Sequence, residues 1–112
     1  MAQQTQHEDN YLVLTTNPEQ LKPILLAAAD LEANGDFKIV FYGSKVTELL
    51  QPETQQYIEL ATKQDVKISV CRMSLDRLKI DPLKIPTQIE IVDNAFLYAF
   101  QLQKKEYKTL NL

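Results

Sequence analysis

The chain has few of the residues on which most enzyme and metal-site chemistry depends, with one cysteine, Cys71, one histidine, His7, and no tryptophan. A structural zinc or iron–sulfur site needs more cysteine and histidine ligands than these. A disulfide within the chain is impossible, and a Ser-His-Asp or Cys-His pair would have to use His7, which lies in a polar stretch. We therefore expect no metal site and no histidine-based catalysis.

Glycine and long apolar runs are also scarce. The two glycines, Gly35 and Gly43, are too few for a phosphate-binding loop or a dinucleotide fingerprint, so no cofactor is expected. The longest wholly apolar run, residues 24–29, is far shorter than the roughly 20 residues of a membrane span, and residues 1–10 lack the apolar core of a signal peptide. We expect a cytoplasmic protein that does not bind membranes.

The composition describes one compact domain, with 112 residues, 45% of them hydrophobic, and a net charge of -3. Residues 1–60 carry nine acidic and three basic side chains, whereas residues 61–112 carry six acidic and nine basic ones. Most of the positive excess lies between Lys63 and Lys84 and indicates a solvated face of mixed charge. No basic run is interleaved with aromatic residues, so nucleic-acid binding is not expected.

Strand-like and helix-like segments alternate along the chain. Short aliphatic and β-branched runs predict strands at residues 11–15, 37–42, 66–70, 89–92 and 107–110. Helices are expected from about residue 20–22 to 33, and over residues 44–50, 52–64, 74–79 and 94–104, with a loop at 80–87 and a mobile tail at 1–10. This order predicts one α/β domain over residues 11–112, with a mostly parallel sheet of about five strands and helices on both faces.

Four residues give the expected helix boundaries. Gly35 is expected to end the first helix in a left-handed cap conformation. Ser44 and Ser74 are expected to cap two short helices, the second of which closes at Lys79.

The expected helix at residues 94–104 is almost entirely apolar. Its apolar residues are Ala95, Phe96, Leu97, Tyr98, Ala99, Phe100 and Leu102. A helix that is apolar all round has to be covered all round, and a small sheet covers one side. We expect a second subunit on the other side, the alternative being loops of the same chain.

Cys71 is the one side chain whose neighbours in the sequence could assist a nucleophile. It falls at the end of a predicted strand, and reactive groups of parallel sheets gather at that edge. The start of the following helix, with Arg72 and Arg77, would favour a thiolate or persulfide anion, while Gly43 and Ser44 at the end of the preceding strand offer backbone N–H groups to an anion. The alternative is that Cys71 is a small buried hydrophobe.

Three groups of residues stand in a distinctive order: residues 40–43 followed by Val46 and residues 49–50, residues 66–71 with Ser74, and residues 102–103 with Tyr107. Their order and spacing resemble the DsrE/DsrF-like family, which includes YchN-like proteins and sulfur-relay subunits such as TusD. The resemblance implies a Rossmann-like fold, assembly as a homo-trimer or homo-hexamer, and a persulfide on the strand-end cysteine. Met73 stands where the closest subgroup frequently has asparagine, and Glu106 where a glycine is usual.

These observations lead to one main hypothesis for function. The chain is expected to hold sulfane sulfur as a persulfide on Cys71 and to exchange it with donor and acceptor proteins. Arg72, Arg77 and Ser74 would stabilise the anion, and Gly43 and Ser44 would form the opposite wall of the pocket. One alternative is a noncatalytic oligomeric binding or regulatory module of the same fold, and another is a small-anion sensor that uses the Gly43 turn.

Overall fold

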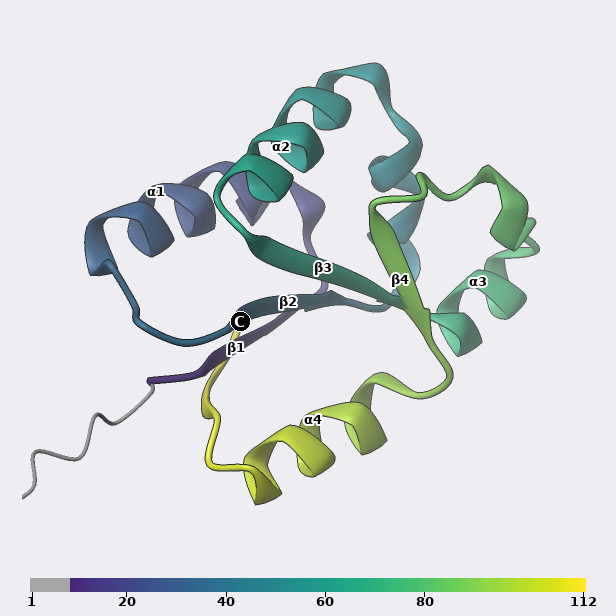
Figure 1. Cartoon of the computed structure of the whole chain (residues 1–112). Helices are drawn as coiled ribbons and strands as arrows, with labels where there is room; N and C mark the ends of the chain where they lie inside the picture. Colours follow the sequence, from purple (N-terminus) through teal and green to yellow (C-terminus); the bar gives the residue numbers. More distant parts are fainter. Residues whose placement is uncertain (1–8) are drawn as a thin grey trace, which may run out of the picture.

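A single five-stranded parallel sheet organises the computed structural model, which describes residues 9–112 (Figure 1). The strands are β1 (Tyr11–Thr15), β2 (Phe37–Phe41), β3 (Val66–Cys71), β4 (Ile89–Val92) and β5 (Lys108–Asn111). The α-helices are α1 (Leu21–Leu31), α2 (Pro52–Lys63), α3 (Arg72–Leu78) and α4 (Ala95–Lys104), with short 3-10 helices η1 (Pro18–Gln20), η2 (Ser44–Leu50) and η3 (Pro82–Lys84). The strand order is β4-β3-β2-β1-β5 and every pairing is parallel, which confirms the expected fold class.

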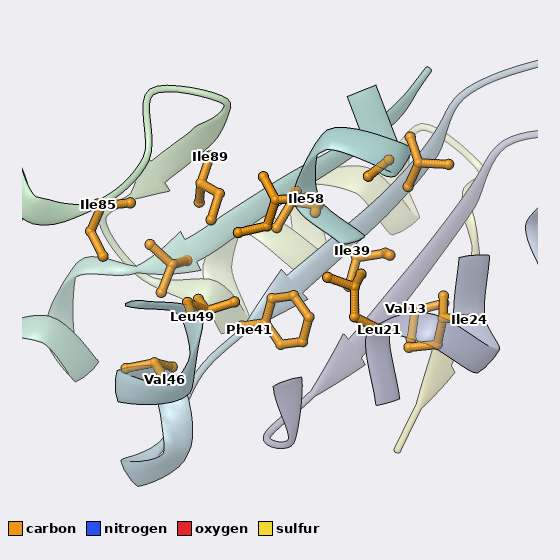
Figure 2. Close-up of a cluster of buried hydrophobic side chains, with 14 of the residues drawn as sticks. Val13, Leu21, Ile24, Ile39, Phe41, Val46, Leu49, Ile58, Ile85 and Ile89 are labelled. Carbon is orange, nitrogen blue, oxygen red and sulfur yellow. The ribbon is translucent and has the colours of Figure 1, made fainter. Parts of the chain in front are cut away.

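Alternate residues of the strands pack against different helices, because successive side chains of a strand point to opposite faces. Figure 1 shows α1 and α2 on one side of the sheet and α4 on the other. Val13, Ile39 and Phe41 belong to the larger core cluster, which also contains buried residues of α1 and α2 (Figure 2). Val40 and Cys71 belong to the smaller cluster, which also contains the buried residues of α4. Cys71 therefore faces α4.

The first helix ends in a different way from the one expected. It stops at Leu31, and Glu32, with φ 51°, takes the left-handed conformation that was predicted for Gly35. Gly35 has another role, because a Cβ atom there would lie 2.3 Å from the Oδ1 atom of Asn10. Gly35 is therefore needed because two chain segments pass close together at this point, and it does not form the helix cap.

Asp9 and Asn10 lie at the end of the segment expected to be a tail, and both are hydrogen bonded. The Asp9 N–H donates to Oδ1 of Asn34 at 2.8 Å, and Asn10 Oδ1 accepts from the Asp36 N–H at 2.7 Å. The rest of that prediction, residues 1–8 with His7, lies outside the described residues.

The two serines do not cap helices as expected. Helix η2 begins at Ser44 itself, after Gly43, whose φ is 92°. Helix α3 begins at Arg72, directly after β3, so Ser74 lies in its first turn. Because the chain turns from strand to helix at Cys71, the whole first turn of α3 stands at the carboxyl edge of the sheet.

Helix α4 has one buried face and one apolar face in contact with solvent. Ala95, Ala99 and Leu102 are buried, whereas Phe96, Leu97 and Phe100 are 54%, 53% and 63% exposed. Tyr42 contacts Phe96, but more than half of each of these three residues stays open to solvent, so loops of residues 9–112 do not cover this face. In the same range, none of the helices reaches the length and apolar character that crossing a bilayer requires.

Candidate functional site

A cavity of about 350 Å³ opens at the carboxyl edge of the sheet, where the ends of β2, β3 and β4 meet helix starts. It is lined by Tyr42, Gly43, Ser44, Cys71, Met73, Ser74, Arg77, Leu78, Asn94, Ala95 and Phe96. Five of the six residues singled out in the sequence line it, and Arg72 does not. This edge is where parallel α/β sheets place their ligands.

Cys71 lies at the back of this cavity with little exposed surface. It is the last residue of β3, its backbone is extended, and the residue is 5% exposed. Its sulfur accepts a hydrogen bond from the backbone N–H of Ala95, with an N to Sγ distance of 3.4 Å. Cys71 is thus part of the cavity wall, and one hydrogen-bond donor is directed at its sulfur.

The helix start that contacts the sulfur belongs to α4 and not to α3. The Asn94 side chain caps α4, its Oδ1 accepting from the N–H groups of Phe96 at 2.9 Å and Leu97 at 3.3 Å. The N–H of Ala95 is then the first-turn donor left for Cys71. The sequence analysis predicted that the start of the helix following the cysteine favours an anion. The N–H that bonds the sulfur comes instead from α4, because α3 runs on from the cysteine backbone whereas α4 faces the side chain.

The two arginines occupy different surroundings. Arg72 donates through Nε to Oδ1 of Asp93 at 3.0 Å, and its side chain is 44% exposed. This ion pair takes the Arg72 charge away from the cavity. Arg77 lines the cavity, and no other lysine or arginine is among the lining residues. Of the two charges expected beside the sulfur, one is present in the cavity wall.

Gly43, another residue of the cavity wall, lies in a turn that Ser74 holds. Gly43 has φ 92° and ψ -173°, a region that essentially only glycine populates. Its N–H donates to the Ser74 Oγ atom at 2.9 Å. Ser74 therefore joins α3 to the end of β2, and the Gly43 N–H is already bonded within the protein, which removes a donor that the small-anion sensor required.

The mouth of the cavity is mainly apolar and aromatic. Tyr42 and Phe96 meet edge to face with ring centroids 5.2 Å apart, and Met73 is 57% exposed. Tyr42, Asn94 and Ala95 were not identified as site residues from the sequence. Asn94 carried a usable signal, since it follows the strand that pairs with the cysteine strand and has a side chain typical of helix caps.

Comparisons with known proteins agree on the fold. The model of the DsrE/DsrF-like family matches residues 9–112. No curated protein matches the chain. The solved structure of MTH1491 from Methanobacterium thermoautotrophicum, a protein of unknown function, superposes with a TM-score of 0.77 at 15% identity, covering 93% of this chain and 100% of that chain.

Two further solved structures are similar. The ychN protein from E. coli has a TM-score of 0.70 at 22% identity, covering 92% of this chain and 99% of that chain. BT1422 from Bacteroides thetaiotaomicron, a conserved protein of unknown function, has a TM-score of 0.70 at 12% identity, covering 92% and 95% of the two chains. At these identities the likeness establishes the fold alone.

Proposed function

Because the chain belongs to the DsrE/DsrF-like family, we propose that it is a sulfur carrier that holds sulfane sulfur as a persulfide on Cys71. The observation that carries this proposal is that Cys71 lines a cavity of about 350 Å³ and that a backbone N–H is directed at its sulfur. The cavity leaves room for the added sulfur atom.

The transfer is a pair of sulfur exchanges that need no external oxidant. The Cys71 thiolate attacks the outer sulfur of a donor persulfide, the donor S–S bond breaks, and the donor leaves as a thiolate. An acceptor thiolate then attacks the outer sulfur on Cys71 and releases the Cys71 thiolate. Arg77 in the cavity wall neutralises the anion that is present before and after each step.

The lone cysteine suits a carrier. With no second thiol in the chain, no intramolecular disulfide competes with the persulfide. We place this chemistry in the cytoplasm, where thiols are kept reduced, with sulfur donor and acceptor proteins as the partners.

We also propose that the exposed face of α4 packs against further copies of the chain. Phe96, Leu97 and Phe100 form an apolar surface on one helix, and such surfaces on compact domains mark contact sites. The family resemblance implies a homo-trimer or homo-hexamer. Phe96 belongs both to this face and to the cavity wall, so a neighbouring copy would stand beside the sulfur site.

Mass spectrometry of the intact protein tests the carrier function. After exposure to polysulfide, the wild-type protein should gain the mass of one or more sulfur atoms, and dithiothreitol should remove the gain. The matched Cys71→Ser variant should gain nothing. A wild-type protein with unchanged mass, or an equal gain in the Cys71→Ser variant, would refute the proposal.

The low exposure of Cys71, 5%, favours a second candidate function, a noncatalytic oligomeric binding or regulatory module in which the thiol only packs. Alkylation separates the two functions. A carrier thiol should react with iodoacetamide in the folded protein at neutral pH. A thiol that reacts only after denaturation would identify the binding module.

A further inference from the structure

The first turn of α4 is bonded in a way that leaves one donor for the cysteine sulfur. Three N–H groups open this helix, those of Ala95, Phe96 and Leu97. Asn94 Oδ1 takes two of them, at 2.9 and 3.3 Å, and the Cys71 sulfur takes the third at 3.4 Å. The side chain of Asn94 thus decides which backbone donor points at the sulfur.

Two further contacts hold this turn against the cysteine strand. Cys71 pairs with Val92 in the register of β3 and β4, so the two strand ends lie side by side. One residue farther along each segment, Arg72 and Asp93 form their ion pair at 3.0 Å. The start of α4 is therefore tied to the strand end by the sheet ladder, by an ion pair and by the asparagine cap.

We infer that Asn94 is a positioning residue for the Cys71 sulfur, because it fixes the first turn of α4 so that the Ala95 N–H and the positive end of the helix are directed at the sulfur. The inference rests on the proposed function in one respect, namely that the Cys71 sulfur is the atom that carries the transferred sulfur. The other titratable groups that line the cavity are Tyr42 after β2 and Arg77 of α3, and the Arg72–Asp93 pair follows the paired ends of β3 and β4. None of these is altered in the test.

The test measures the rate of alkylation of the full-length protein by iodoacetamide over a series of pH values. Cys71 is the only thiol, so the signal has one source. In Asn94→Ala the rate at neutral pH should fall about threefold to tenfold and the midpoint of the profile should move to higher pH, as expected for loss of a helix-terminus interaction. The matched control is Asn17→Ala, which removes the side-chain cap of η1, an Oδ1 contact with the Glu19 N–H at 3.0 Å. Asn17 is not among the residues that line the cavity.

Two replacements that keep a cap separate electrostatics from helix stability. Asn94→Ser should restore the wild-type profile. Asn94→Asp should restore thermal stability but keep alkylation slow at neutral pH, because a carboxylate near the sulfur disfavours the thiolate. If Asn94→Ala does not fold, the comparison of Asn94→Ser with Asn94→Asp still tests whether Asn94 is a positioning residue.

Either of two results overturns the inference. One is a wild-type alkylation profile in Asn94→Ala, and the other is identical profiles for Asn94→Asp and Asn94→Ser. Alkylation involves no sulfur transfer, so this outcome is separate from that of the polysulfide experiment. A wild-type protein that takes up no sulfur refutes the carrier function, whereas only the alkylation profiles bear on Asn94.

Discussion

Replacing Gly43 by alanine should destabilise the domain by forcing a side chain into a backbone conformation that essentially only glycine adopts. Gly43 has φ 92° and ψ -173°, and residues other than glycine held in such regions cost about 1–3 kcal/mol each. The added Cβ would also lie 3.3 Å from Thr16 Cγ2, so this neighbour would have to move slightly. We therefore expect the free energy of unfolding to fall by about 2 kcal/mol, which is a loss of roughly 10 °C in Tm for a domain of this size.

Urea denaturation followed by circular dichroism measures this change, with Ser44→Ala as the matched control. Ser44 is the next residue, is exposed, and makes no side-chain cap bond to η2, so its replacement should change the free energy of unfolding by less than about 0.5 kcal/mol. Gly43→Ala should also take up less sulfur from polysulfide, because the turn forms one wall of the cavity. A free energy of unfolding within about 0.5 kcal/mol of wild type for Gly43→Ala would refute the reasoning.

Three further changes test the charge, the backbone and the apolar face. Arg77→Gln should slow alkylation of Cys71 at neutral pH more than Arg72→Gln does, because Arg77 lines the cavity and Arg72 is paired with Asp93; equal rates would contradict this assignment. Glu106→Gly should raise the urea midpoint, corresponding to about 0.5–1 kcal/mol, because Glu106 has φ 68°, and an unchanged or lower midpoint would count against it. Phe100→Glu should shift the proposed oligomer toward monomer in size-exclusion chromatography with light scattering, since Phe100 is 63% exposed and is not among the residues that line the cavity; a mass equal to that of wild type would exclude this part of α4 from the proposed contact.

The expected elements agreed well with the structure where the pattern was local. The strand at residues 11–15 and the strand at residues 89–92 have the predicted bounds, because runs of β-branched and aliphatic residues favour strands wherever they lie. Helix ends were less well predicted. Glu32 and Glu106 adopt left-handed conformations that residue type alone would assign to glycine, and only the packing of the following segment requires them.

The candidate site also contains some features that the sequence predicted and others that it did not. The position of Cys71 at a strand end could be predicted from the order of strands and helices, and so could the presence of Gly43, which follows the adjacent strand β2, in the same cavity wall. The groups that the two arginines face could not be predicted from the sequence. Arg72 and Arg77 are five residues apart on one short segment. Whether each one faces an acid or the cavity depends on where β4 ends and α4 begins.

Taken by itself, the sequence determined a parallel α/β domain with a single thiol at the carboxyl edge of its sheet, because alternating apolar periods and scarce residue types are properties of the chain alone. The tertiary structure decided which helix contacts that thiol. Ala95 is 24 residues from Cys71 in the chain, and the two meet because β4 pairs with β3 and delivers the start of α4 to the sulfur. Contacts of this kind depend on the order of strands in the sheet, which the residue pattern of one segment does not specify.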